Sequence, residues 1–415
     1  MALRKMTMPL YFMEKFKSND MIRLKHVWLS MIACMCMVAC TTVKEGNSLD
    51  QCNVVASRVV TDGDTMIVCD VSKIEQQIKL PLSTLVKDWK LLKLENSSKE
   101  AMVQPAYIYP SEKYILIHPA EYNRETMLFD KTGKYLFDIG RKGNGPGEIV
   151  LDIADIEMDE DNDCVYIRDH KPSRILKFRL STGEYLTEIP LSYSRAIDFL
   201  LNPKDETLIV SCWPHKRIED GIPWIWKQDF QGNILLELPK KAFNKDYWYE
   251  FWLWNRNDEI VFVDFNIPGR QDTLWHYDIP SNRLKPHFTV DFGNEIPNHQ
   301  YEDTSDFYLV SLLNDLGMGE ALNIKKRFLI DKKTLKGAYV DIVLDGYGDF
   351  SITHRWMYLK NSYFTMGLYP HQIAETCEKL LANPENLTQE EKRNLQELLD
   401  GITEDDNAFI LYGKI

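Results

Sequence analysis

The sequence has few cysteines, and none of them is spaced like a redox or metal-binding pair. Eight of its 415 residues are cysteine. The five that follow Cys40 are scattered through the chain without C-x-x-C spacing, namely Cys52, Cys69, Cys164, Cys212 and Cys377. Because this set is odd in number and dispersed, it excludes a disulfide framework and the common zinc sites. We expect these side chains to behave as small buried apolar groups.

The sequence also lacks the short motifs that mark many catalytic and cofactor sites. H-E-x-x-H, G-x-S-x-G and S-x-x-K do not occur. Residues 159–163 alternate like a calcium loop, but Cys164 replaces the sharp-turn glycine and His170 replaces the bidentate glutamate. The glycine-rich residues 140–148 lack the G-x-x-x-x-G-K-[ST] pattern of a phosphate loop. We therefore expect no cofactor and no metal, and a binding protein more than an enzyme.

Long apolar runs are missing too, although one short run lies near the N-terminus. Residues 27–38 are apolar over 12 positions, which is too short to span a bilayer. Basic residues precede the run, and Met37-Val-Ala-Cys40 follows it in the manner of a bacterial lipobox. This pattern predicts that residues 1–39 are a signal peptide and that Cys40 is the lipidated mature N-terminus. An ordinary signal peptide with a chance cysteine is the alternative.

Acidic residues between the first methionine and the basic region bear on where translation begins. Glu14 and Asp20 make residues 1–20 unlike the n-region of a signal peptide. We therefore expect translation to start at Met21 and not at Met1.

Basic residues are in the minority. The chain has 49 Lys and Arg against 62 Asp and Glu, a net charge of −13. Removal of residues 1–39 takes away six basic and two acidic residues, which leaves 43 against 60 and a net charge of −17. Such a surface repels phosphate backbones and anionic headgroups. Nucleic acid is therefore excluded as an expected partner.

What the sequence does contain is a hairpin that recurs about every 50 residues. Strand-like residues 126–129 and 135–139 flank a turn at Gly133. Equivalent turns are centred on Gly183, Gly232 and Asn282, at spacings of 50, 49 and 50 residues, and a fifth falls near residues 336–337. Four-stranded units with this period are typical of a β-propeller, whose units must stack to bury their apolar faces. We predict an all-β fold, a six-bladed β-propeller with four-stranded antiparallel blades, over residues 76–415.

The strands expected from this pattern cover most of the predicted ring. They are residues 114–118, 126–129 and 135–139; 153–158, 164–168, 175–180 and 185–189; 207–212, 224–230 and 234–238; 251–254, 260–265, 273–278 and 287–292; 328–330 and 339–343; and 356–359, 363–368 and 409–415. Residues 78–94 alternate like a strand but have no local partner. We therefore expect this N-terminal strand to pair with residues 409–415 in the last blade and close the ring.

Two segments fall outside this repeat. Residues 371–402 have apolar positions at helical spacing and a Thr388-x-x-Glu391 capping box, which predicts a small helical insertion near the C-terminus. Residues 40–75 are polar and turn-rich at first, and we expect them to form a lipidated tether.

The glycine-rich loop carries a resemblance to a known family. Residues 129–134 (FDKTGK) and 140–148 (GRKGNGPGE) resemble the six-bladed, NHL-like β-propeller lipoproteins of Bacteroides-type bacteria, which typically carry a G-x-G-P-G-E loop after the first blade. Residues 272–278 (DTLWHYD) and 405–409 (DDNAF) resemble further sequence patterns of the family. The likeness extends from Ile78 to the C-terminus. The resemblance implies a propeller lipoprotein linked to nutrient uptake at the outer membrane. It brings no agreed catalytic residues.

In a propeller, the loops after the second and fourth strands of each blade emerge on one face, around the mouth of the central channel. On this chain those loops concentrate arginine, histidine and tryptophan, although the protein is acidic. The candidate ligand-binding residues are Arg141, Lys142, Asn144, Glu148, His170, Arg174, Trp213, His215, Arg270, His354 and Arg355. Arginine forks and aromatic rings suit carboxylates or sugar rings. Ordinary exposed loop residues are the alternative interpretation.

These observations predict a cell-envelope lipoprotein that acts as a binding or scaffold propeller. The expected ligand is a glycan or a small anionic molecule, and an envelope protein is an expected partner. The anchor is expected in the outer membrane, on its periplasmic side or at the cell surface. Catalytic residues that converge from several blades leave no linear motif. A propeller hydrolase or lyase acting on a glycan or small ester is therefore the alternative.

Overall fold

The computed structural model describes residues 49–120, 124–150, 153–169, 173–193, 196–212, 222–238, 250–256, 259–265, 273–314, 323–355, 357–403 and 405–415. Residues 51–415 form one unit, to which all of the strands belong. The predicted signal peptide, Met21 and Cys40 lie outside the described residues.

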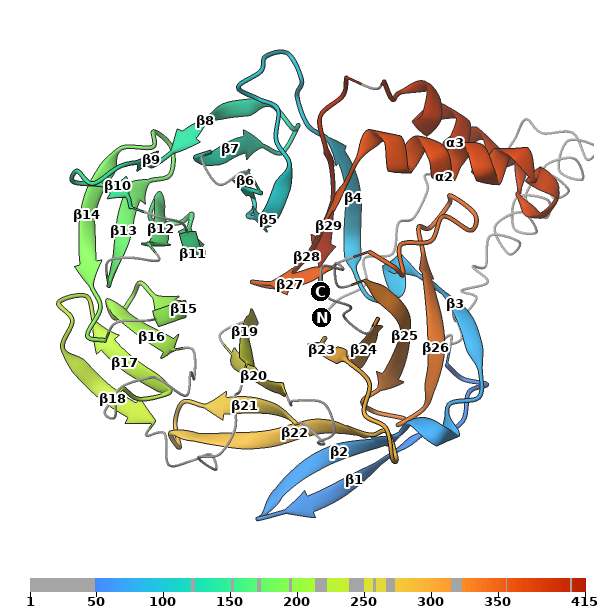
Figure 1. The fold of residues 1–415 in the computed structure, drawn as a ribbon, viewed down its shortest axis with the longest axis horizontal. Helices are drawn as coiled ribbons and strands as arrows, with labels where there is room; N and C mark the ends of the chain where they lie inside the picture. The colour runs from blue at the N-terminus through green and yellow to red at the C-terminus, as the bar shows by residue number, and fades with distance from the viewer. Residues whose placement is uncertain are drawn as a thin grey trace, which may run out of the picture. The chain divides into compact units, whose positions relative to one another are not determined.

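Successive antiparallel sheets form the blades of a propeller, which confirms the predicted six-bladed fold (Figure 1). Blade one consists of β5 (Pro105–Pro110), β6 (Tyr114–Pro119), β7 (Thr126–Asp130) and β8 (Tyr135–Ile139). Blade two consists of β11 (Ile153–Asp159), β12 (Cys164–Asp169), β13 (Arg174–Arg179) and β14 (Tyr185–Pro190). Blade three consists of β15 (Ala196–Asn202), β16 (Thr207–Cys212), β17 (Ile225–Asp229) and β18 (Ile234–Leu238).

The remaining blades complete the ring. Blade four contains β19 (Glu250–Arg256), β20 (Glu259–Phe265), β21 (Leu274–Asp278) and β22 (Arg283–Asp291). Blade five contains β23 (His299–Asp303), β24 (Phe307–Leu313), β25 (Ile324–Asp331) and β26 (Gly337–Val343). Blade six contains β27 (Tyr358–Lys360), β28 (Tyr363–Leu368), β29 (Phe409–Lys414) and, from the N-terminal region, β4 (Lys87–Lys93).

The N-terminal strand closes the ring as expected, but only in part. Strand β4 pairs antiparallel with β29, and Leu91 lies opposite Leu411. Strand β3 (Gln77–Pro81) instead pairs parallel with β26 as a fifth strand of blade five. The expectation that residues 78–81 belong to the last blade is therefore wrong. Alternating apolar residues indicate a strand but not its partner, and the chain crosses from blade five to blade six at the short helix η3 (Leu82–Thr84).

Residues 56–70, expected in the tether, form a hairpin that widens blade four. Strands β1 (Ala56–Thr61) and β2 (Asp64–Asp70) pair antiparallel, and β2 pairs parallel with β22. The two turn residues, Asp62 and Gly63, both have positive φ, 51° and 87°. This is the type I′ geometry that suits an Asp-Gly pair. Ile67 and Cys69 join the core beneath the hairpin, and their burial explains why the segment is ordered.

The turns between third and fourth strands share a local chemistry that accounts for the 50-residue period. In blade one, the Asp130 carboxylate accepts hydrogen bonds from the backbone N–H groups of Thr132 and Lys134. In blade three, Asp229 accepts from the backbone of Gln231 and Asn233 in the same way. The glycine in each turn has a φ near +85° (86° and 85°), which side chains rarely adopt.

The predicted helical insertion is confirmed between β28 and β29. It consists of α2 (Pro370–Ala382), the short helix η5 (Pro384–Asn386) and α3 (Gln389–Asp400). The capping box is formed, because the Thr388 hydroxyl accepts from the Glu391 backbone and the Glu391 carboxylate accepts from the Thr388 backbone. Among the described residues, no helix is long and apolar enough to cross a membrane.

The apolar faces of neighbouring blades form the core. Between blades one and two, Leu128 and Ile139 meet Ile156 and Phe178. Four of the five cysteines after Cys40 are free and buried, as expected: Cys52, Cys69, Cys164 and Cys377. Two short parallel strands, β9 (Arg141–Lys142) and β10 (Glu148–Ile149), connect the first two blades and carry the glycine-rich loop.

Candidate functional site

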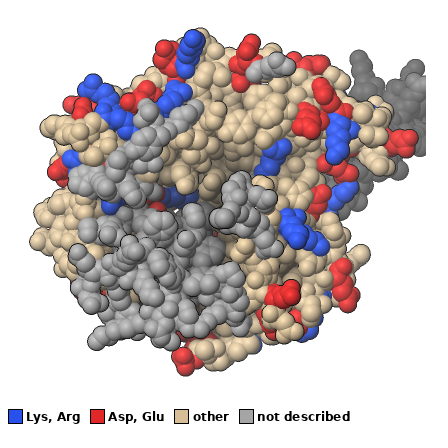
Figure 2. All heavy atoms as spheres, in the orientation of Figure 1, with Lys and Arg blue, Asp and Glu red and all other residues tan. Residues whose placement is uncertain are grey.

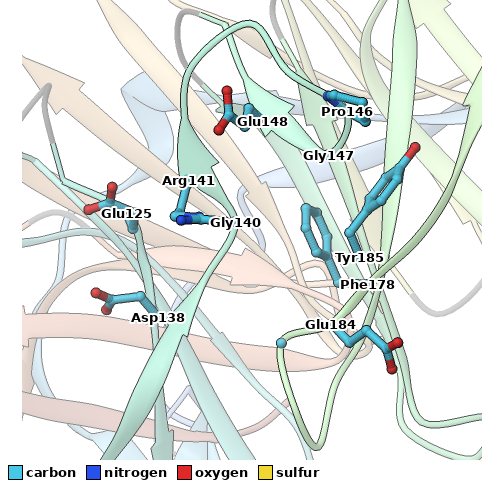
Figure 3. A pocket seen from close by; sticks show the side chains of 11 residues that line it. Glu125, Asp138, Gly140, Arg141, Pro146, Gly147, Glu148, Phe178, Glu184 and Tyr185 are labelled. Carbon is cyan, nitrogen blue, oxygen red and sulfur yellow. The ribbon is translucent and has the colours of Figure 1, made fainter.

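A pocket of about 550 Å³ lies between blades one and two, beside the glycine-rich loop (Figure 3). Its lining comes from the end of blade one, the loop itself and the outer part of blade two: Glu125, Asp138, Gly140, Arg141, Pro146, Gly147, Glu148, Phe178, Gly183, Glu184 and Tyr185. In Figure 1, β9 and β10 lie at the outer rim of the ring, between β8 and β14. The pocket is therefore a rim pocket and not the mouth of the central channel, where the sequence analysis placed the site.

Glu148 shapes the loop on one side of the pocket. One of its carboxylate oxygens accepts a hydrogen bond from the Gly145 N–H at 2.8 Å, and its own N–H donates to the Gly145 carbonyl at 3.1 Å. The carboxylate fills the space that a Cβ would need at Gly143 and at Gly145. A side chain at either position would therefore displace the Glu148 carboxylate, which acts as an internal support for the loop.

Gly147 brings the loop against an aromatic wall. Its φ is +73°, and a Cβ there would lie 2.5 Å from Cγ of Tyr185. The Tyr185 ring packs edge-on against Phe178, with ring centroids 5.8 Å apart. Phe178 is buried, whereas Tyr185 keeps part of its surface exposed. Blade two thus presents a fixed aromatic side chain to the pocket.

The charged groups of the lining are mostly acidic. Glu125, Asp138, Glu148 and Glu184 contribute carboxylates, and Arg141 contributes the one guanidinium of the lining. Arg141 is exposed, and within the part of the chain that the structure describes no side chain pairs with it. The anionic ligand expected from the arginine-rich loops would meet repulsion here. On the face drawn in Figure 2, basic and acidic side chains are mixed around the rim rather than gathered by sign.

The carboxyl group of Asp138 has a raised pKa. Desolvation by the pocket wall raises its pKa, and the negative charge of Glu125 adds to this, against the lowering by Tyr135 and Arg124. The pKa of Tyr135 is raised to about 12 by burial and by the neighbouring Asp138 charge. A carboxyl whose pKa is raised inside a pocket is a candidate proton donor.

Arg174 lies next to the loop, and the protein binds two of its three guanidinium nitrogens. It is 14% exposed and forms ion pairs with Glu188 at 2.8 Å and with Asp169 at 3.5 Å. The same guanidinium donates to the Glu148 carbonyl at 2.9 Å. The residue therefore fastens the loop to blade two. Sequence reasoning could not see its acidic partners, which are fixed only by strand register.

The other candidate residues are not gathered at this pocket. Lys142 and Asn144 belong to the loop without lining the cavity. His354 and Arg355 lie before blade six, where a His354 ring nitrogen is 2.9 Å from the Ile324 carbonyl and Arg355 donates to the Gln372 side chain. Burial lowers the pKa of Arg355. The candidates His170, Trp213, His215 and Arg270 lie outside the described residues.

The inner strands meet in a charged cluster that sequence reasoning missed. The Lys360 ammonium on β27 contacts Asp155 on β11 and lies 3.4 Å from Glu157. Asn361 donates to Glu157 at 2.8 Å. The cluster joins the inner strands of blades six and two, which are not neighbours in the ring. Among the described residues no group of side chains is arranged to hold a metal ion.

The fold is similar to that of solved structures at low sequence identity. A protein of Bacteroides fragilis NCTC 9343 that is inferred to be exported is 15% identical, with a TM-score of 0.56, over 84% of this chain and 99% of its own. Hydrazine synthase of Kuenenia stuttgartiensis is 13% identical, with a TM-score of 0.39, over 77% of this chain and 88% of its own. The WD40 repeats of RRP9 are 10% identical, with a TM-score of 0.42, over 82% of this chain and 100% of their own.

These likenesses concern the fold alone, and only the first is close enough to support an argument. No curated protein matches the sequence. A family match, in contrast, covers most of the ring that the structure describes. The family described as a domain of unknown function, DUF4934, matches residues 66–414, and the protein belongs to this family.

Proposed function

We propose that this protein is a cell-envelope lipoprotein that binds a glycan in the rim pocket and does not turn it over. The observation that carries the proposal is the lining of that pocket, where the Tyr185 ring stands among carboxylates and an exposed Arg141. Aromatic faces pack on the apolar faces of sugar rings, and charged side chains form strong hydrogen bonds with hydroxyl groups. The volume of about 550 Å³ suits a ligand of one or a few rings.

The charge of the lining favours a neutral glycan over an anion. Glu125, Asp138 and Glu184 leave Arg141 outnumbered, so a carboxylated or phosphorylated ligand would meet net repulsion. Hydroxyl groups can donate to the carboxylates and accept from the guanidinium. A neutral sugar therefore uses both kinds of side chain.

Binding measurements on single variants test this site. After a glycan screen identifies a ligand, calorimetric titration of Tyr185→Ala should show binding weakened by about 10- to 150-fold, because an aromatic contact and its buried area are lost. Arg141→Ala should weaken binding about 5- to 30-fold, as expected for one exposed charge-assisted hydrogen bond.

Two matched controls keep the test specific. Tyr107→Ala removes a tyrosine of the inner strand β5, which is 41% exposed, and Arg393→Ala removes an exposed arginine of α3. Both should bind like the wild type. If Tyr107→Ala weakens binding while Tyr185→Ala does not, the ligand lies at the channel and the rim pocket is refuted.

The raised pKa of Asp138 favours the alternative function, a hydrolase or lyase acting on a glycan or small ester. Asp138, whose pKa is raised by burial and by the Glu125 charge, would be the proton donor in such chemistry. Incubation of the bound glycan with wild type and Asp138→Asn decides between the two. Product formed by the wild type and lost in the variant would establish the enzyme, whereas an unchanged glycan supports binding alone.

The proposal includes the lipid anchor at Cys40 and a place in the outer membrane, where a glycan-binding propeller would serve nutrient uptake beside an envelope protein partner. The support is the short apolar run before the Met37–Cys40 box and the likeness to a Bacteroides fragilis protein that is inferred to be exported. Mass spectrometry of the membrane fraction should find an N-terminal, acylated Cys40, and Cys40→Ser should release the protein from membranes. An intact Met1 or Met21 on wild-type protein would contradict the anchor.

A further inference from the structure

The hairpin β1–β2 gives blade four an outer edge unlike those of the other blades. In Figure 1 it extends outward from the ring, with β1 as the last strand of a six-stranded sheet. Val60 is 70% exposed and Val59 is 40% exposed, and Val54 just before the strand is 56% exposed. These are half of the large apolar side chains that are exposed in the described part of the chain. The strand therefore combines an open backbone edge with apolar surface.

The register of the hairpin identifies the backbone groups at this edge. Thr61 lies opposite Asp64 across the two-residue turn, so this pair exchanges hydrogen bonds within the hairpin. The pattern alternates along β1, so the N–H and C=O groups of Arg58 and Val60 point away from β2. The backbone bond from Ala56 N–H to the Leu335 carbonyl, at 3.2 Å, agrees with this alternation and covers the start of the strand. The open edge thus consists of residues 58–60.

The outer strands of the other blades carry groups that hinder strand addition, although β18 also exposes Ile234 and Leu235. Charged residues, prolines or a covering side chain block strand addition at such edges. The protecting residues are Asp138 on β8, Glu188 and Pro190 on β14, Lys79 and Pro81 on β3, and Lys87, Lys90 and Lys93 on β4. On β18 the Glu237 carbonyl is bonded to Asn282 of the next blade. On β1 the charged residue is Arg58, and its guanidinium turns back to the Lys332 carbonyl at 2.8 Å.

We infer that β1 pairs antiparallel with β1 of a second copy of this chain, about a two-fold axis at Val59. In this register Arg58 of one copy lies opposite Val60 of the other. The outward N–H and C=O groups of both residues then all form hydrogen bonds with the second copy. If either strand were shifted along the other, some of these groups would lose their partner. Val59 faces its own counterpart, and Ser57 faces Thr61, a pairing of hydroxyl groups that favours strand association. The two blades become one continuous sheet.

Charge favours this edge over the other, mostly acidic surfaces of the chain as the contact between two copies. The chain carries a net charge of −13, so most contacts between two copies oppose like charges. Residues 56–61 contain no acidic side chain, and the pairing places Arg58 against valine. The hairpin also projects from the ring, so two rings can approach edge to edge (Figure 1). The paired strands are short, and the dimer is therefore weak, with a dissociation constant on the order of 10–100 μM.

Sedimentation of the full chain over a range of concentrations tests the pairing. The wild type should dimerise reversibly, and Val60→Lys should weaken the dimer about tenfold or more, because it brings a lysine of each copy close to Arg58 of the other. Leu235→Lys is the matched control, since Leu235 is 52% exposed on the outer strand β18. It should leave dimerisation unchanged. A monomer at all concentrations up to about 1 mM, or a dimer that resists Val60→Lys, would overturn the inference.

A cysteine variant tests the register and does not depend on how well Val60→Lys folds. In the proposed register the Val59 residues of the two copies form a non-hydrogen-bonded antiparallel pair. The Cα atoms of such a pair lie about 4.5 Å apart, within the range that a disulfide bridges. Under mild oxidation, Val59→Cys should therefore link two chains efficiently. Leu235→Cys should give no more than the background of the wild type, whose described cysteines are buried. Equal linking by the two variants would refute the pairing.

Discussion

A chain that lacks residues 409–415 is expected to lose the cooperative fold of the propeller. Strand β29 pairs with β28 on one side and with β4 on the other, so its removal leaves β4 without a partner and β28 paired only with β27. It also removes Phe409, Ile410, Leu411 and Tyr412, which are between 0% and 4% exposed.

The size of this effect follows from the burial of those side chains. Each large apolar side chain stabilises a fold by about 1.5–3 kcal/mol, so their loss removes about 6–12 kcal/mol. That is comparable with the whole free energy of unfolding of a domain, about 5–15 kcal/mol. Circular dichroism on heating should show no cooperative transition for the shortened chain.

A milder truncation provides the control. Removing only Lys414 and Ile415 takes away an exposed ion pair between Lys414 and Glu112 and the end of the strand. It should change the melting temperature by a few degrees at most. If the chain shortened at Phe409 melted like the full-length protein, β29 would not be the strand that closes the ring.

Arg327→Met is expected to destabilise the protein by about 3–5 kcal/mol, because it leaves a buried carboxylate without its cation. Arg327 is 0% exposed and Glu302 is 4% exposed, on strands β25 and β23 of blade five. Ser311 joins them, since its hydroxyl donates to Glu302 at 3.2 Å and accepts from the Arg327 Nε at 2.8 Å. Arg327 also donates to the Arg355 carbonyl at 2.9 Å, which holds the connection to blade six.

The effect of Arg327→Met should depend on pH, with a definite sign. Burial raises the pKa of Glu302 to about 7, although Arg327 and Ser311 lower it. Because the folded protein then binds a proton more tightly than the unfolded chain, this group's contribution to stability falls as pH rises from about 4.5 to 7. Loss of the Arg327 charge raises the pKa of Glu302 further, so the decrease in stability continues to higher pH in the variant. The deficit of the variant should therefore be larger at pH 8 than at pH 5.

Urea unfolding at both pH values measures this deficit. Arg179→Met is the control, because Arg179 is 43% exposed and its ion pair with Glu184 is a surface pair. It should change the free energy of unfolding by about 0.5 kcal/mol or less at either pH. Equal deficits for Arg327→Met at pH 5 and pH 8 would show that Glu302 does not respond to the lost charge.

The blade architecture was predictable because its turns repeat a chemistry that is visible in the sequence. The glycines at 133, 183 and 232 adopt positive φ, and Asp130 and Asp229 cap the turns beside two of them. Those residue types are needed wherever the third strand turns into the fourth, so their period is the period of the blades. The inner strands β5, β15 and β23 were missed, and so was β24. Strand β5 begins and ends with proline, which obscures a strand pattern.

The sequence of the hairpin β1–β2 contains a hairpin pattern that the prediction did not use. Asp62-Gly63 between two runs rich in valine, isoleucine and threonine is a strong hairpin pattern. Its polar neighbours suggested a tether instead. The parallel pairing of β2 with β22 joins residues more than 200 positions apart, at Ile67 and Phe288, and no local pattern indicates it.

The sequence identified only part of the candidate site, because the residues that line it come from two different blades. Arg141 and Glu148 were identified from the glycine-rich loop, and both line the pocket. Glu125, Asp138 and Tyr185 were missed, since each is an ordinary residue of a strand or turn until the blades are stacked. Arg174 looked free in the sequence, but strand register gives it Glu188 as a partner at 2.8 Å. Residue types alone do not reveal which arginine is already neutralised.

Hydrogen–deuterium exchange with and without the bound glycan tests the proposed binding site most directly. If the rim pocket is the site, protection should be confined to the loop at residues 140–149 and to residues 183–185 of blade two. The inner strands β5 and β11 should exchange at the same rate with and without the glycan. Protection of β5 and β11, with the loop unchanged, would place the ligand at the central channel and contradict the account.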